Sequence, residues 1–337
     1  MEKRLGRQTL RFIDPPAVLS HAAVAGKKEG DGPLKTCFDA ISQDSYLGEE
    51  SWEKAESHML HHCFALACDK AGLAPSTLDF VLAGDLLNQC VSSSFAMKDS
   101  GTPYLGLYGA CSTMAESLAL ASMLIDGGYA RSACAVTGSH FCSAERQYRF
   151  PLEYGGQRPP TSQWTVTGAG AVLLGKNAPG IRVTHVTFGK IVDEGITDAN
   201  AMGSAMAPAA YDTLRRHFED TGRGPEDYDA IFTGDLGLLG HELLQELMDR
   251  DGIRLGPRYM DCGVLIYDLK AQDVGAGGSG AGCCASVLAG HILSAMEKGV
   301  WGRILFAATG ALLSATSAQQ GSSIPGICHA VVFERGQ

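Results

Sequence analysis

Two segments of the chain occur twice, and this internal duplication limits the possible folds more than any other feature of the sequence. Residues 79–86 (DFVLAGDL) match residues 229–236 (DAIFTGDL), 150 residues later. Residues 111–138 align without gaps on residues 283–310, 172 residues later, with seven identical positions. The two offsets differ by about 22 residues, which predicts extra residues in the second copy around 252–273. A repeat this long predicts two related halves and excludes a solenoid.

Each copy alternates apolar strands with helices, which favours largely parallel sheets covered by helices. The helices predicted at residues 112–126 and 285–298 are apolar or small nearly all round, so we expect both to lie buried between two sheets. Further helices are expected at residues 52–72, 206–221 and 240–251. Strands are expected at residues 80–83, 132–137, 165–174, 230–233 and 303–308. The sequence therefore predicts one compact α/β body with two halves, residues 1–178 and 179–337.

Composition excludes several classes of protein. Apolar residues make up 45% of the 337 residues, which is enough for a large core and excludes intrinsic disorder. Twenty-seven basic against 37 acidic residues give a net charge of −10, which disfavours nucleic acid as a partner. No apolar run has the length of a membrane span, and residues 1–14 lack the apolar core of a secretory signal. We expect a soluble, cytoplasmic protein.

The cysteines predict free thiols. Their number, 11, is odd, and most of them stand inside apolar segments. Buried thiols of this kind are typical of a reducing compartment and not of a disulfide framework. No C-x-x-C spacing occurs, so we expect no metal site.

Cys111 is the first candidate for chemistry. It follows the turn Gly109-Ala110 and stands at the predicted N-terminus of the first buried helix. The unpaired N–H groups and the dipole at such a position favour a thiolate and lower the pKa of the thiol. The arrangement resembles a nucleophile elbow with sulfur in place of oxygen. The alternative is a small buried cysteine, the role expected of Cys283 at the paired position.

Four further residues are candidates for a ligand site, each with a structural alternative. His140 ends the second strand of the first copy and faces either the crevice or solvent. Asp235 follows a strand at the sheet edge where open α/β sheets bind ligands, but its repeat partner Asp85 suggests that both cap helices. Ser279 and Gly280 lie in a glycine-rich turn that either offers N–H groups to a carboxylate or only permits tight packing.

Two loops and one helical residue complete the candidates. The acidic connection at residues 193–210 is either a lid with carboxylates for calcium or a solvated crossover loop. Residues 148–163 supply Arg149 and Arg158, whose guanidinium groups match a ligand carboxylate or lie on the surface. Glu116, five residues after Cys111, points about 140° away from the sulfur, so we expect it to pair with a buried partner.

Long segments of the chain carry a family resemblance. The duplicated halves, the two buried helices and the Gly-Ala-Cys elbow resemble the thiolase-like superfamily of thiolases and ketoacyl synthases. Residues 3–12, 150–161 (FPLEYGGQRPPT), 164–170 (WTVTGAG) and 198–210 resemble the stage V sporulation protein AD family, and this closer likeness covers almost the whole chain. The resemblance implies a thiolase-like αβαβα five-layer fold built from two duplicated halves.

The resemblance also implies a function. Members of this family are expected to bind dipicolinic acid, free or as its calcium chelate, for uptake into the developing spore. They are expected to work with the other SpoVA membrane proteins, as cytoplasmic proteins peripheral to the forespore inner membrane. The thiolase-like superfamily commonly forms dimers through the first sheet, so we expect a homodimer.

This sequence departs from the condensing enzymes of the superfamily at two positions. Those enzymes need two later groups, histidines or a histidine and an asparagine, to polarise the thioester carbonyl and stabilise the carbanion. Asp235 stands where the first is expected, His241 comes six residues later, and residues 277–283 (GGSGAGC) contain neither Asn nor His. We therefore expect no carbon–carbon bond formation and no cofactor.

Two functions remain open from the sequence, beside a purely structural adaptor. In the first, ligand-binding residues line a cavity that does no chemistry; the candidates are Cys111, His140, Asp235, Ser279 and Gly280. In the second, Cys111 is the nucleophile of an acyltransferase or ketoacyl-synthase-like enzyme.

Overall fold

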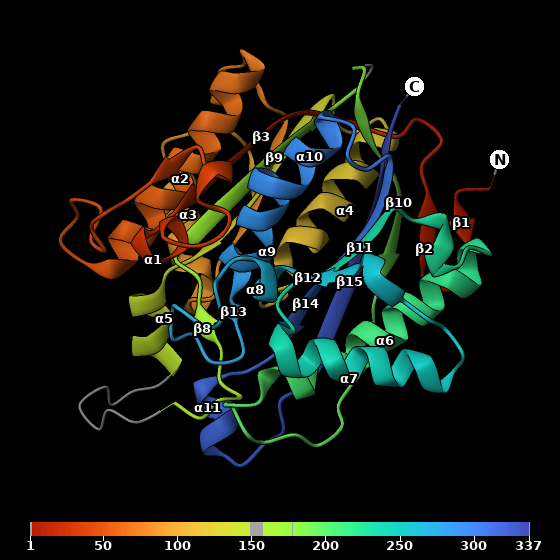
Figure 1. The fold of residues 1–337 in the computed structure, drawn as a ribbon. Coiled ribbons are helices and arrows are strands. Elements are labelled where there is room, and N and C mark those ends of the chain that lie inside the picture. The colour runs from red at the N-terminus through yellow and green to blue at the C-terminus, as the bar shows by residue number, and fades with distance from the viewer. Residues whose placement is uncertain (1, 149–157, 177, 337) are drawn as a thin grey trace.

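The structure is a computed structural model that describes residues 2–148, 158–176 and 178–336. One mixed sheet of 13 strands wraps around two central helices, and further helices cover its outer faces (Figure 1). The strands of the first half are β1 (Arg4–Leu5), β2 (Thr9–Arg11), β3 (Ala17–Ala25), β4 (Ala40–Ile41), β5 (Phe80–Gly84), β6 (Tyr104–Gly106), β7 (Ser132–Ser139), β8 (Trp164–Thr165) and β9 (Gly168–Gly175). Those of the second half are β10 (Ile181–Phe188), β11 (Ala230–Thr233), β12 (Tyr259–Asp261), β13 (Gly278–Ser279), β14 (Arg303–Ala311) and β15 (Gly326–Arg335). Strands β8 and β13 pair with each other in a separate two-stranded sheet, and the other strands form the large one.

The strand order shows the duplication directly. Along the sheet the order is β12-β11-β14-β15-β10-β3-β9-β7-β5-β6, so the two halves repeat one five-strand arrangement outward from the middle. A single residue pair, Arg182 with Ala17, joins β10 to β3. The two predicted sheets therefore form one continuous sheet, because the edge strands of the halves meet at this pair. The N-terminal strand β2 crosses over and pairs with β10 of the second half.

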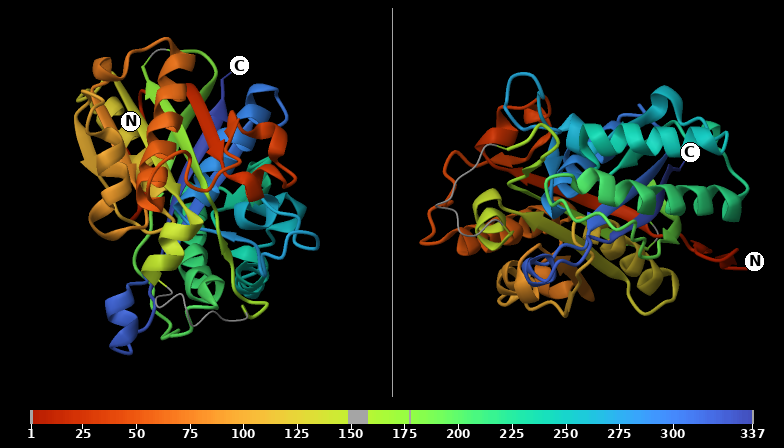
Figure 2. Two further views of the ribbon diagram at one scale, coloured as in Figure 1. Left: turned by 90° about the vertical axis from the view of Figure 1, so that its left-hand side faces the viewer. Right: turned by 90° about the horizontal axis from the view of Figure 1, so that it is seen from below.

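Helices fill three layers around the two halves of this sheet. The central layer holds α4 (Thr113–Asp126), α9 (Ala281–Val287) and α10 (Leu293–Glu297), with a π-helical turn at Leu288–Ile292 between the last two. The longer outer helices are α2 (Trp52–Ala71), α3 (Val91–Met97), α6 (Met202–Thr221) and α7 (Gly237–Arg250). The shorter helices are α1 (Lys27–Gly30), α5 (Phe141–Tyr148), α8 (Cys262–Leu265) and α11 (Ala315–Gln319). Figure 2 shows α6 and α7 side by side against the second half.

The central helices are buried as their composition predicts. Every residue of α9 is buried, and α4 packs into the same apolar cluster. Glycines permit the close contact with the first sheet, because a Cβ at Gly170 would lie 2.0 Å from the carbonyl oxygen of Ala285. In the same way, a Cβ at Gly282 would lie 2.2 Å from the carbonyl oxygen of Gly168. The prediction of two buried helices between the halves is confirmed.

Two boundaries differ from the expectations. The strand expected at 165–174 is interrupted between β8 and β9, and the helix expected from residue 285 begins at Ala281. The excess of the second copy lies mainly after β12, since β12 begins only 155 residues after its counterpart β6, so it falls in the later part of the predicted stretch 252–273 and in the few residues that follow it. Helix α8 and the chain up to β13 make up most of that excess. No helix among the described residues is long and apolar enough to cross a membrane.

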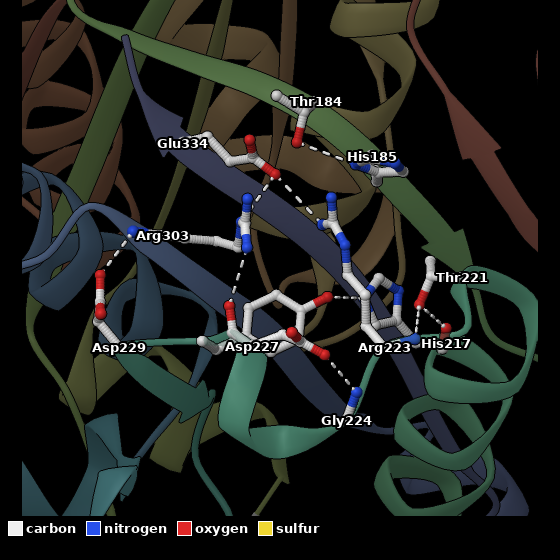
Figure 3. Close-up of polar contacts among 11 residues, drawn as sticks. Thr184, His185, His217, Thr221, Arg223, Gly224, Asp227, Asp229, Arg303 and Glu334 are labelled. Atoms are coloured by element: carbon white, nitrogen blue, oxygen red, sulfur yellow. Dashed lines mark hydrogen bonds and ion pairs between the residues drawn. The ribbon is translucent and has the colours of Figure 1, made fainter. Parts of the chain in front are cut away.

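A buried chain of hydrogen bonds through His217, which is labelled in Figure 3, ties α6 to the second half of the sheet. The hydroxyl groups of Thr9 and Thr187 lie 2.9 Å apart, and the Thr187 hydroxyl lies 2.7 Å from His217 Nδ1. The other ring nitrogen of His217 lies 2.6 Å from the hydroxyl of Tyr228. The imidazole therefore bridges a strand on one side and the segment before β11 on the other.

Candidate functional site

Cys111 stands in a sharp turn at the N-terminus of α4. Ala110, the residue before it, has φ +50°, a left-handed conformation that is rare for a residue with a Cβ. The turn is closed by the hydroxyl of Ser112, which donates to the carbonyl of Gly109 at 2.6 Å, and by that of Thr113, which donates to the carbonyl of Ala110 at 2.6 Å. The elbow predicted from the sequence is therefore present.

The Cys111 side chain borders a small cavity of about 70 Å³ at the end of the molecule where α5 and α11 lie in Figure 1. The lining residues are Leu86, Tyr108, Ala110, Cys111, Ala144, Glu145, Tyr148, Thr165, Ala199, Met202, Ser279, Ala311 and Leu313. Cys111 itself is 7% exposed. Most of the wall is apolar, with hydroxyl groups from Tyr108, Tyr148, Thr165 and Ser279. At this volume the cavity is too small for a long acyl chain.

Asp235 lies behind this wall and faces Cys111. Its side chain is fully buried and accepts hydrogen bonds from the backbone N–H of Gly280 at 2.9 Å and from the hydroxyl of Thr309 at 2.8 Å. Burial raises the pKa of the Asp235 carboxyl to about 6, although hydrogen bonds from Cys111, Gly280, Thr309 and Ser279 work in the opposite direction. Four of the five predicted ligand residues, Cys111, Asp235, Ser279 and Gly280, are thus brought together.

The repeat partners Asp85 and Asp235 have different roles. Asp85 caps its own turn, accepting from the backbone N–H groups of Leu87 at 2.8 Å and Ser93 at 2.7 Å. Asp235 does not cap the turn that follows it, because Asp261 at the end of β12 accepts the backbone N–H groups of that turn.

Asp261 accepts from the backbone N–H groups of Leu236 at 2.9 Å and Gly237 at 3.0 Å. These bonds hold the turn after β11 and leave the Asp235 side chain directed at Cys111. The sequence analysis missed Asp261. The sequence contained one signal for it. The segment that forms β12 ends in an acidic residue, whereas the matching strand of the first copy, β6, ends in Gly106.

The thiol of Cys111 is held in its protonated form. Burial raises its pKa well above the ordinary value, and the charge of Asp235 and a hydrogen bond to its carboxyl raise the pKa further. The expectation that the helix N-terminus lowers this pKa is therefore wrong. Burial of the sulfur, together with the carboxylate beside it, outweighs the effect of the partial charge at the helix end on this pKa.

Neither candidate histidine reaches the cavity. His140 Nε2 lies 2.7 Å from the carbonyl oxygen of Ser45, and the ring borders a separate groove of about 380 Å³ beside Lys28 and Trp164. His241, on α7, stacks on the ring of Tyr259 with centroids 4.2 Å apart. The structure thus separates His140 from the other predicted ligand residues. Among the described residues that line the Cys111 cavity, none is a histidine.

Two tyrosines that the sequence analysis did not single out form one side of the cavity. The hydroxyl groups of Tyr108 and Tyr148 lie 3.4 Å apart, and the Tyr148 hydroxyl donates to the carbonyl of Leu86. Next to them Arg158 Nη2 lies 2.8 Å from Glu145 Oε1, and Glu145 borders the cavity. A guanidinium group is therefore present close to the cavity wall.

The other expectations have mixed outcomes. The connection predicted at 193–210 supplies Ala199 and Met202 to the cavity, whereas the Asp198 carboxylate accepts from the backbone N–H of Asn200 at 2.8 Å. Glu116 does not pair as expected, since its buried Oε2 has no partner in the described part of the chain.

Two further expectations concern cations. Arg149 lies outside the described residues. Among the residues that the structure places, no three His, Cys, Asp or Glu side chains gather in a way that holds a metal ion.

The fold of the chain is similar to that of thiolase-like enzymes. The structure of OleA from Xanthomonas campestris with bound acetamide superposes with a TM-score of 0.61 at 12% identity, over 96% of this chain and 99% of that one. The 3-oxoacyl-(acyl carrier protein) synthase III, FabH, from Pseudomonas aeruginosa PAO1 superposes with a TM-score of 0.59 at 14% identity, over 96% and 99%. At these identities the likeness establishes the fold alone, and the predicted thiolase-like α/β fold is confirmed.

Comparisons of sequence are much closer. Residues 6–334 match the family model described as Stage V sporulation protein AD (SpoVAD). The stage V sporulation protein AD of Bacillus subtilis (strain 168) is 46% identical over 333 residues, covering 99% of this chain and 98% of that protein. The chain belongs to the SpoVAD family of sporulation proteins.

Proposed function

We propose that this sporulation protein is a receptor that holds dipicolinic acid, free or as its calcium chelate, in the Cys111 cavity without catalysing a reaction. The observation that carries the proposal is the pairing of the Cys111 thiol with a buried carboxyl. In a condensing enzyme the sulfur acts as a thiolate, and neighbouring groups donate hydrogen bonds to the thioester carbonyl. Asp235 keeps the proton on the sulfur and, when ionised, is itself an acceptor.

The walls of the cavity suit a small aromatic diacid. The rings of Tyr108 and Tyr148 and the side chains of Leu86 and Leu313 offer flat and apolar surface for a heteroaromatic ring. The hydroxyl groups in the wall can donate to carboxylate oxygens. Arg158, beside Glu145, is a bidentate partner for a second carboxylate at the rim, and the Glu145 carboxylate suits the calcium ion of the chelate.

Isothermal titration calorimetry with dipicolinate, with and without calcium chloride, tests the proposal. We expect saturable binding with about one ligand per chain. Ala199→Phe fills the cavity and is expected to weaken binding at least about tenfold, a loss of about 1.4 kcal/mol. Ala74→Phe, at an exposed site away from the cavity, is the matched control and is expected to bind as the wild type does. No heat of binding at millimolar ligand would refute the receptor function.

The rival function, an acyltransferase that uses Cys111, is tested separately. The protein is incubated with acetyl-CoA and longer acyl-CoA donors, and its intact mass is measured. We expect no mass increase, because the protonated thiol is a poor nucleophile. An acyl adduct that maps to Cys111 would contradict the non-catalytic part of the proposal.

We also propose that the protein is a homodimer that pairs through the first half of the sheet. Strand β6 is the outermost strand there, and Leu105, Tyr108 and Phe95 beside it are 40%, 46% and 60% exposed. Open strand edges with apolar side chains favour a partner strand. Sedimentation velocity is expected to give a dimer for the wild type and a monomer for Leu105→Lys. A monomeric wild type would refute the dimer.

Association with the SpoVA membrane proteins at the forespore membrane is the last part of the proposal, and membership of the family supports it. Flotation with vesicles that carry reconstituted SpoVA proteins is expected to bring the chain to the membrane fraction, and empty vesicles are the control. Equal recovery with both would contradict a protein partner.

A further inference from the structure

The carboxyl of Asp235 is buried without a positive charge to balance it. The charged or titratable groups that face it come from several elements of the fold. They are Cys111 in the turn before α4, Asp261 on β12, Cys262 on α8, Cys283 and Cys284 on α9, and Cys328 on β15. All of them are thiols or carboxyls, and none of them is a cation. Within the described residues, the polar partners of Asp235 are the thiol of Cys111, hydroxyl groups and a backbone N–H.

A negatively charged ligand in the cavity adds a second negative charge close to the Asp235 carboxyl. Cys111 and Ser279 contact both the cavity and Asp235, so a carboxylate bound there lies a single side chain away from a second buried carboxylate. Two like charges at such a distance in a poorly solvated site cannot both remain ionised at low cost. Either a proton or a cation has to enter with the ligand.

We propose that the cavity takes up one proton with each free diacid that it binds, and that Asp235 receives this proton. The inference rests on the proposed function and adds the protonation state in which the site holds its ligand. The proton comes from the solvent and binds to a carboxylate oxygen of Asp235. It returns to the solvent when the ligand leaves.

Asp235 is better placed for this role than the other groups at the cavity. The Cys111 thiol and the tyrosine hydroxyls already carry their protons, and Glu145 is paired with Arg158. Asp261 is farther back, where four donors, including the hydroxyl of Thr233 at 2.7 Å, occupy its two oxygens. Burial raises the pKa of Asp235 to about 6 in the empty cavity, so near neutral pH this carboxyl is ionised and ready to accept a proton.

Proton uptake has a consequence for affinity. Above the pKa of the empty site, the binding constant falls by up to about tenfold for each unit by which the pH rises. The calcium chelate carries its own positive charge and needs less compensation from the protein. We therefore expect the free diacid to bind more tightly on the acid side of neutrality, and the chelate to be less sensitive to pH.

Calorimetry in buffers with different heats of ionisation measures the proton directly. Dipicolinate is titrated into the wild-type protein at about pH 7.5 in phosphate and in Tris, and the difference in heat gives the protons taken up per ligand. We expect a value approaching about one for the wild type and close to zero for Asp235→Asn. Asp85→Asn, the repeat counterpart that only caps its own turn, is the matched control and is expected to keep the wild-type value.

The outcomes separate this inference from the proposed function. Binding without proton uptake, with an affinity that is constant from about pH 6.5 to 8, would overturn the inference and leave the receptor function intact. Uptake that persists in Asp235→Asn would overturn the assignment to this residue. Absence of binding at every pH would refute the proposed function and the inference with it. If Asp235→Asn fails to fold, the pH dependence of the wild type still decides whether a proton is taken up.

Discussion

Cys111 and Asp235 each hold the other in a state that disfavours condensation chemistry. The thiol donates to the carboxyl, and the carboxyl raises the pKa of the thiol on top of the effect of burial. In the receptor proposed above, burial of the sulfur and an acidic residue in place of a carbonyl-directed donor together account for the loss of the nucleophile and its helper. The shape of the elbow does not depend on the chemistry of the sulfur, because hydrogen bonds from the hydroxyl groups of Ser112 and Thr113 to backbone carbonyls hold the turn.

Alkylation tests this pair. We expect iodoacetamide to modify Cys111 much more slowly than the half-buried Cys37 near neutral pH, because alkylation requires the thiolate. Asp235→Asn removes the charge that raises the thiol pKa at unchanged access, and is expected to accelerate the modification of Cys111 severalfold. Peptide mass spectrometry over time gives both rates. A wild-type Cys111 that reacts faster than Cys37 would contradict the account.

Close packing at the elbow makes a second prediction. A Cβ at Gly310, at the end of β14, would lie 2.5 Å from the carbonyl oxygen of Gly109. Gly310→Ala is therefore expected to destabilise the protein by about 1–3 kcal/mol in urea unfolding and to weaken dipicolinate binding. Gly302→Ala is the control, since its Cβ would meet only the Asp229 carboxylate, at 3.3 Å. Equal stability of the two variants would refute the packing argument.

Sequence reasoning named four of the residues that the structure brings together around Cys111, but it could not decide the role of Asp235. Because Asp235 follows a strand, the sequence placed it at the edge of the sheet where ligands bind. Its match with Asp85 in the repeat supported the alternative role, capping of the next helix, equally well. The choice depends on Asp261, which comes from a neighbouring strand and satisfies the turn in its place. Contacts between distant segments of this kind leave no local pattern, and the same reason explains why His140 was assigned to the wrong groove.

At the scale of the elements, α6 depends on a buried imidazole. His217 bridges Thr187 and Tyr228. Beside it Arg223 and Arg303 both contact the carboxylate of Glu334, at 3.2 and 3.1 Å (Figure 3). Burial, with the neighbouring His185 and Arg223 acting in the same direction, lowers the pKa of His217 to about 3. The helix is thus attached to the sheet through a ring that the folded state keeps neutral.

This attachment predicts a loss of stability in acid. An unfolded histidine titrates near pH 6.5, so the contribution of His217 is complete above that pH and is lost progressively as the pH falls toward about 3. The free energy of unfolding in urea, measured between about pH 7.5 and 4.5, is expected to fall less steeply for His217→Gln than for the wild type. His58→Gln, an exposed site, is the control and should keep the wild-type slope. Identical slopes for all three proteins would contradict the prediction.

Among the elements, the sequence predicted those with an unusual composition. Two helices that are apolar all round could only be buried, and the structure places both in the central layer. The π-helical turn before α10 was not predicted, because it depends on tertiary packing: a Cβ at Gly290 would lie 2.8 Å from the carbonyl oxygen of Cys37. The single sheet was missed for a similar reason, since one residue pair connects its halves.

At the scale of the whole molecule, duplication brings the N-termini of two central helices together. The thiol of Cys284 at the start of α9 donates to the carbonyl of Cys111 at 3.5 Å, so the two helix starts are in contact. Only the first copy turns its cysteine toward the cavity, because the second buries Cys283 completely. The fold fixes where a ligand site lies, and the side chains at that place decide what it does.

A crystal structure of the protein soaked with dipicolinate tests the central claim most directly. The account predicts density for a planar diacid in the Cys111 cavity, in contact with Ser279 and with no bond to the sulfur. Calcium, when present, should lie between the diacid and a carboxylate of the wall. An empty cavity at saturating ligand, with the diacid bound elsewhere or a thioester on Cys111, would contradict it.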